Sequence, residues 1–195
     1  MLGLPKATEL SKQLPKNAIY AKFQMNTAEK AKIDADISRI TIVNEVSAEK
    51  VPIADGDQVK SFFVLLVALK KKDFDDKTII TISKLIPQNM LLVLECGDEA
   101  KLATYHTKLM QTEWKRKEEL SVELKGLNLD AVWENIIIQI GGITVDQGNT
   151  LDEQIAVDEQ RMRIQKELDR LTKQAKKKFE LVQKMNRLKK ELEEN

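Results

Sequence analysis

The sequence is poor in the residues on which most catalytic and metal sites are built. Its 195 residues include a single cysteine, Cys96, and a single histidine, His106. Four-ligand zinc needs more of these two residues than the chain has. One cysteine also excludes a disulfide within the chain, which is the usual condition of a protein from a reducing compartment. We therefore expect no metal, no cofactor and a cytoplasmic location.

Long apolar runs and aromatic side chains are also scarce. The longest apolar run, residues 62–69, is far shorter than the roughly 20 residues that span a bilayer, and the first sixteen residues have no apolar core of signal-peptide length. We expect a soluble protein with no membrane contact. Aromatic residues make up 5% of the chain, and the formal net charge is +1, so the total charge predicts no partner.

Two weak candidates for chemistry remain among the rare residues. Cys96 and His106 fall on two segments that we expect to be neighbouring strands, so they could form a nucleophile–base pair. A cysteine after an apolar run is more often small core packing. The pair Gly141-Gly142 follows an expected helix instead of opening one, so it is a helix stop and not a phosphate loop.

The apolar pattern predicts an α/β (or α+β) domain over residues 1–148, with a small mixed sheet and flanking helices. Runs at 61–70 and 89–96 are apolar on both faces and enclose a helix at 77–86, an order that favours parallel pairing of the two strands. Further expected elements are a strand with one wet face at 100–110, a possible strand at 118–124, and a helix at 128–140 that Asn128 or Asp130 would cap.

The N-terminal part is spaced by Pro5 and Pro15, which predicts an extended arm with a short helical turn between the prolines. Asn26 and Glu29 form a capping-box pattern that begins a helix ahead of a β-branched strand at 39–46. The polar residues of the arm either face water or dock a partner protein or a phosphate; they are Lys6, Lys12, Lys16 and Tyr20.

The last segment, residues 149–195, has the character of a coiled coil. From residue 151 onward there is no glycine and no proline. Two apolar stripes with steps of three and four residues predict partner-binding surfaces. The first comprises Ile164, Leu168, Leu171 and Ala175, and the second comprises Leu181, Met185, Leu188 and Leu192. The first stripe would continue at Lys178, but the second starts three residues later, at Leu181. This break indicates either a local change of winding in one long helix or the corner of a helical hairpin.

Positive charge is concentrated in the same segment. Residues 161–190 contain twelve lysines and arginines against three acids. Phosphate contacts need only basic side chains on a common face, so a DNA contact is one interpretation and a solvated coiled-coil face is the other. The residues that we expect to contribute to nucleic-acid binding are Lys173, Lys176, Lys177, Lys184 and Arg187. The lack of an aromatic set argues against readout of single strands.

Three stretches occur together in an informative order. They are GLPKATELSKQLPKNAIY, KLIPQNMLLVLE and KKKFELVQKMNRLKKEL, at residues 3–20, 84–95 and 176–192. In this order they resemble a bacterial family catalogued only as a domain of unknown function. Members of that family often occur beside helicase and methyltransferase genes of restriction-like defence systems. The resemblance implies this genomic neighbourhood and transfers no activity and no catalytic residue.

A divergent metal-dependent nuclease is the enzymatic alternative. Metal-dependent cleavage of DNA needs at least two acidic ligands and a lysine near the attacking water. Glu45, Glu95 and Lys70 are the residues available for it, but Ala68 occupies the position of the acid in an acid-x-lysine pair. The family that the chain resembles often carries glutamate near that position, so a degenerate nuclease ancestry stays open.

The pattern as a whole favours a non-catalytic accessory or adaptor subunit of a bacterial restriction-like or anti-phage system. Its apolar stripes would bind a partner helix, either from its own copy or from a helicase or methyltransferase subunit, and its basic face would lie near DNA. A structural homodimer without nucleic-acid contact is the third alternative.

Overall fold

The computed structural model describes the backbone of residues 2–193 and the side chains of residues 2–186. The chain divides into two compact units, Met1–Thr144 and Val145–Asn195. The sequence placed the corresponding division after residue 148. Within the described part, none of the helices is both long enough and apolar enough to cross a bilayer.

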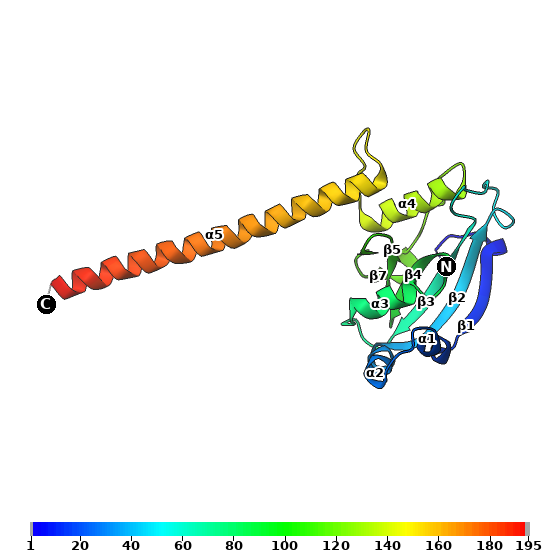
Figure 1. Ribbon diagram of the computed structural model, residues 1–195, viewed down its shortest axis with the longest axis horizontal. Coiled ribbons are helices and arrows are strands. Elements are labelled where there is room, and N and C mark those ends of the chain that lie inside the picture. Colours follow the sequence, from blue (N-terminus) through cyan, green and yellow to red (C-terminus); the bar gives the residue numbers. More distant parts are fainter. Residues whose placement is uncertain (1, 194–195) are drawn as a thin grey trace. The chain divides into compact units, whose positions relative to one another are not determined.

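The first unit is built on one mixed sheet of seven strands (Figure 1). Six strands follow the order β1-β2-β3-β4-β5-β6, and β7 pairs with β5. Strands β3 and β4 are parallel and the other pairs are antiparallel, which confirms the predicted mixed sheet and its parallel pair. The strands are β1 (Glu9–Leu14), β2 (Ile37–Ser47), β3 (Ser61–Leu69), β4 (Asn89–Cys96), β5 (Glu99–Tyr105), β6 (Leu109–Gln111) and β7 (Lys115–Arg116).

Helices flank the sheet in the first unit, and side-chain caps begin three of these helices. The helices are η1 (Lys6–Thr8), α1 (Lys16–Lys22), α2 (Thr27–Asp36), α3 (Asp76–Ser83), η2 (Lys117–Glu119), α4 (Leu129–Gly141) and α5 (Leu151–Glu193). Asn26 and Glu29 form the predicted capping box of α2. Asp75 caps α3 and Asn128 caps α4, because each side chain accepts from a backbone N–H of the first turn. Gly142 ends α4 in the left-handed conformation.

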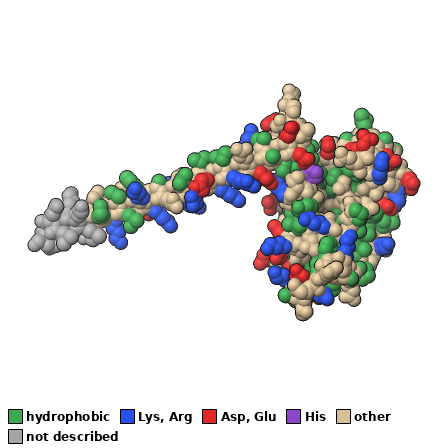
Figure 2. Space-filling model, viewed as in Figure 1, with side chains coloured by type: hydrophobic (Ala, Val, Ile, Leu, Met, Phe, Trp, Pro, Cys, Tyr) green, Lys and Arg blue, Asp and Glu red, His purple; other side chains and the backbone are tan. Residues whose placement is uncertain are grey.

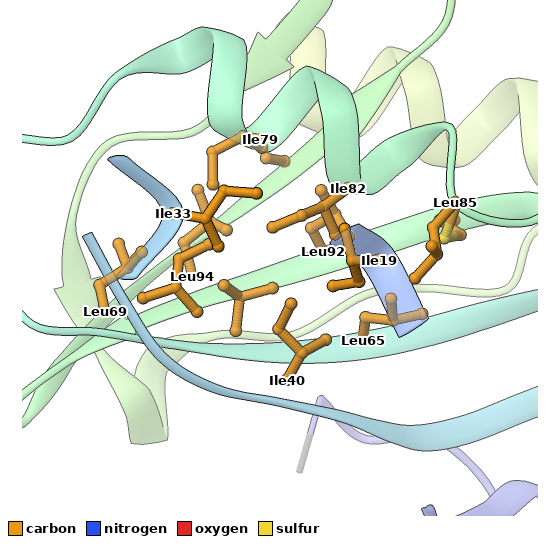
Figure 3. Packing of buried hydrophobic residues seen from close by; sticks show 14 of the residues in the cluster. Ile19, Ile33, Ile40, Leu65, Leu69, Ile79, Ile82, Leu85, Leu92 and Leu94 are labelled. Carbon is orange, nitrogen blue, oxygen red and sulfur yellow. The ribbon is translucent and has the colours of Figure 1, made fainter. Parts of the chain in front are cut away.

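The core lies on both faces of β3. Side chains that alternate along this strand point to opposite faces. Leu65 and Val67 pack in one buried cluster with Ile79 and Ile82 of α3 and with isoleucines of α1 and α2 (Figure 3). On the opposite face, the ring of Phe62 lies 5.2 Å from that of Trp133 in α4, centroid to centroid. A strand covered on both faces explains why its sequence is apolar throughout.

The N-terminal arm is extended with a short helical turn between the prolines, as predicted, and that turn is η1. The sequence did not predict that residues 9–14 pair with β2 as the edge strand β1. A second difference is at residues 118–124, where no strand forms and only Ser121 makes an isolated bridge, to Leu2. The predicted strand at 100–110 is two strands, because the chain turns at residues 106–108 between β5 and β6.

Candidate functional site: the C-terminal helix

Helix α5 runs without a break from Leu151 to Glu193, a length of about 65 Å at 1.5 Å per residue (Figure 1). This continuity decides between the two predicted forms in favour of one helix. A capping box begins it: Thr150 donates its backbone N–H to Glu153 at 2.8 Å, and Glu153 donates its backbone N–H to the Thr150 hydroxyl at 3.3 Å. The hydrogen bond from the Thr150 backbone, with that from its hydroxyl, holds the pKa of Glu153 below its usual range.

One face of α5 carries a row of six apolar side chains, which we call the seam. They are Ile164, Leu168, Leu171, Ala175, Phe179 and Val182. All six are exposed, the five larger ones with 43% to 65% of their surface accessible. Their steps of four, three, four, four and three residues form an eleven-residue repeat, which keeps them within about 80° of one another around an ideal helix. The row therefore stays on one face, with a drift of about 20° per repeat that corresponds to a slight right-handed supercoil.

Phe179 and Val182 are the seam residues that the sequence analysis missed. The heptad pattern placed the next apolar position at Lys178, and the interruption there was interpreted as a three-residue break leading to Leu181. A four-residue step from Ala175 to Phe179 would have found both residues. In the continuous helix, Leu181 and Met185 lie on a face rotated by about 100° from the seam.

The predicted partner-binding residues are thus only partly brought together. Ile164, Leu168 and Leu171 share the seam, whereas Leu181 and Met185 form a separate exposed patch. The side chains of Leu188 and Leu192 lie outside the described residues.

The face opposite the seam is a row of basic side chains, which we call the basic ridge. It comprises Lys166, Arg170, Lys173, Lys177 and Lys184. In an ideal helix its centre lies about 170° from that of the seam. Figure 2 shows this segregation as a line of hydrophobic side chains along one edge of the helix and of Lys and Arg side chains along the other. A helix with such separated faces can bind an apolar surface on one side and anions on the other.

Three of the predicted nucleic-acid contacts, Lys173, Lys177 and Lys184, fall on the basic ridge. Lys176 lies about 80° away from it around the helix, and the side chain of Arg187 is outside the described residues. Lys166 and Arg170 belong to the ridge and were not predicted, although their spacing of four and three residues from Lys173 was available in the sequence.

The structure does not bring the nuclease candidates together. Glu45 is in register with Phe63 of β3, and Glu95 with Ala68, so the two glutamates are offset by about 17 Å along the strands. Glu45 pairs with Lys50 at 2.5 Å and Glu95 with Lys117 at 2.8 Å. The Lys70 ammonium donates to the carbonyl oxygen of Asp34 at 2.6 Å. Among the described side chains, no group of three or more His, Cys, Asp or Glu is arranged to hold a metal ion.

Cys96 and His106 are also kept apart. Cys96 ends β4 in register with Glu99, the first residue of β5, whereas His106 follows the last residue of β5. The two residues therefore lie at opposite ends of a strand of seven residues, about 20 Å apart. His106 lies on the turn at residues 106–108, whereas the sequence analysis predicted it on a strand. A nucleophile–base pair between them is incompatible with this distance.

In the N-terminal arm, Lys16 has a structural role. Its ammonium donates to Asp34 Oδ1 at 2.8 Å and to the carbonyl oxygen of Ile37 at 2.6 Å, and the Tyr20 hydroxyl donates to the same Asp34 oxygen at 2.7 Å. The hydrogen bonds from Lys16 and Tyr20 hold the pKa of Asp34 below its usual range. This contact ties α1 to α2 and β2. Lys6 and Lys12 are exposed.

The fold and the helix together define an α/β protein with a mixed sheet and a long, two-faced terminal helix. The chain belongs to the family described as a domain of unknown function, DUF4391, whose sequence model matches residues 2–194. No curated protein and no solved structure matches the chain.

Proposed function

We propose that this protein is a non-catalytic accessory or adaptor subunit that binds a partner protein through the seam of α5. The observation that carries the proposal is an exposed row of six apolar side chains along one face of a strongly charged helix. Full burial of a Leu, Ile, Val or Phe side chain is worth about 1.5–3 kcal/mol. The burial of five such side chains supplies enough free energy to offset a large part of the free-energy cost of association, which is about 4–15 kcal/mol.

The second part of the proposal is that the basic ridge contacts nucleic-acid phosphates. Five basic side chains lie on one face, and the ridge contains no aromatic residue and no Asn or Gln to read bases. Contacts of this kind neutralise phosphates without distinguishing sequences. The ridge would therefore position the subunit on DNA and leave any sequence selection to the partner.

The setting of this subunit in a restriction-like or anti-phage system rests on the family resemblance. In that setting the partner is a second copy of the chain, a helicase subunit or a methyltransferase subunit. A divergent nuclease is less well supported, because Glu45 and Glu95 are far apart and each is ion-paired. Metal-dependent nicking of plasmid that disappears in Glu95→Ala would favour it over the adaptor function.

The experiment compares the full-length tagged chain with Leu168→Glu and with Lys173→Glu. Both variants place a carboxylate on α5, the first in the seam and the second on the basic ridge. Each protein is expressed in its native host and recovered with its bound proteins, which are quantified by mass spectrometry. We expect at least one bound protein to be recovered with the wild type and with Lys173→Glu, and to be lost with Leu168→Glu. Equal recovery with all three chains would refute the proposed function.

A further inference from the structure

We infer that the partner on the seam is a second copy of this chain, with the two α5 helices antiparallel and centred near residue 173. The inference rests on the proposed function, in which the seam binds a protein, and it names that protein. Three features of the described helix support it: the spacing of the seam, the sizes of the side chains along it, and the charges on its flanks.

The seam is nearly symmetric about residue 173. Ile164 and Val182 lie nine residues to either side of this centre, Leu171 and Ala175 two residues to either side, and Leu168 and Phe179 five and six residues away. When two such helices run antiparallel, each apolar residue meets an apolar residue of the second copy. An unrelated partner helix does not require this symmetry.

Side-chain size distinguishes the antiparallel from the parallel arrangement. In the antiparallel pair, the small Ala175 meets the larger Leu171 of the second copy. A parallel pair in register would place Phe179 against Phe179 and Ala175 against Ala175, so that one layer is crowded and another underfilled. Interiors pack most densely when large and small side chains alternate across the contact.

The flanks of the seam carry complementary charges. Glu167 and Lys178 lie on the same flank, about 20° apart around an ideal helix, six residues before and five residues after the centre. Because equal flanks meet in an antiparallel pair, Glu167 of each copy faces Lys178 of the other. Glu167 also accepts from Arg170 at 2.7 Å, and a carboxylate accepts from both groups through its two oxygens. Lys178 forms no ion pair with any described side chain.

The other flank and the basic ridge do not oppose this arrangement. The other flank is formed by Gln165, Thr172 and Gln183, which carry no charge, and Lys176 lies about 20° beyond Gln165 and Gln183, further from the seam. A parallel pair would place the Glu167 flank against this uncharged flank and would form no ion pairs. The basic ridge points away from the seam, so the ridges of the two copies would lie on opposite outer sides, where salt screens their repulsion.

The test measures the dimerisation constant of the full-length chain by sedimentation equilibrium. Glu167→Lys places like charges at both contacts between residue 167 of one copy and Lys178 of the other, and it should weaken dimerisation about tenfold. The double variant Glu167→Lys with Lys178→Glu restores opposite charges and should recover the wild-type constant. Lys177→Glu changes charge as Lys178→Glu does but lies away from the seam, so it should not weaken the dimer. In a parallel dimer, residues 167 and 178 are about 17 Å apart along the axis, and the double variant would not recover.

A second measurement reports the orientation without changing charge. In a Cys96→Ser background, a mixture of Leu171→Cys and Ala175→Cys chains should form a disulfide between unlike chains faster than either chain does with itself. Faster bonding between like chains would refute the antiparallel arrangement. A chain that stays monomeric and still retains a host protein through Leu168 would refute self-association and leave the proposed function intact. A monomer that retains no protein through Leu168 would refute both.

Discussion

The carboxylate of Asp130, in the first turn of α4, accepts a hydrogen bond of 2.7 Å from the backbone N–H of Val59, seventy-one residues earlier in the chain. The backbone N–H groups of Asp57 and Gln58 donate to the same carboxylate, at 2.6 Å and 3.1 Å. One side chain thereby holds the loop before β3 against the start of α4. Gly56 leaves the space for it, since a Cβ atom there would lie 2.2 Å from Asp130 Oδ1.

Asp130→Asn should lower the melting temperature of the protein, because the variant loses the charge that these three N–H groups stabilise. The hydrogen bond from Val59, the largest cause, holds the pKa of Asp130 below its usual range. The stabilisation is therefore present above the ordinary aspartate pKa of about 3.9 and lost as the pH falls through the lowered pKa. Thermal unfolding of both proteins between neutral and acidic pH should show a difference that disappears in acid. Asp57→Asn, in the same loop, is the matched control, and an equal effect there would contradict the assignment.

Phe62→Ala should lower the free energy of unfolding by about 3–5 kcal/mol, because Phe62 is fully buried against Trp133 and its removal leaves a cavity. Urea unfolding followed by tryptophan fluorescence measures the change. Phe179→Ala provides the comparison, since Phe179 is 65% exposed on α5 and its removal leaves no cavity. A loss of similar size in the two variants would show that the core does not depend on the Phe62–Trp133 contact.

The parts of the fold that were predictable depend on local chemistry. The apolar runs of β3 and β4 and the caps Asn26 and Asn128 act within a few residues, so the sequence displays them directly. The pairing of residues 9–14 with β2 is a contact between distant segments, and nothing in the polar composition of β1 indicates it. The separation of Glu45 from Glu95 likewise depends on strand register. The seam was half predicted, because a heptad template excludes Phe179 whereas an eleven-residue template includes it.

Tyr20 should make the protein less stable in strong alkali. Burial, the hydrogen bond to Asp34 and the negative charge of Asp34 raise the pKa of Tyr20 to about 12. A raised pKa means that folding favours the neutral phenol, so the stabilisation is present below the ordinary tyrosine pKa of about 10 and is lost as the pH rises from there to about 12. Ultraviolet titration should show one late-titrating tyrosine, which disappears in Tyr20→Phe and persists in Tyr105→Phe. Titration of Tyr20 near pH 10 would contradict this prediction.

Substitutions on the basic ridge should change the salt dependence of DNA binding. If Lys173 and Lys177 each neutralise one phosphate of duplex DNA, replacing either by glutamine should reduce the slope of log K against log salt by about 0.9, and replacing both should reduce it by about twice that amount. The effect should be the same for duplexes of different sequence if the two lysines contact phosphates and not base edges. Fluorescence anisotropy over a salt series measures the slope. Lys176→Gln removes the same charge about 80° away around the helix, so an equal loss of slope there would show that the contact depends on the total charge of α5 and not on the ridge.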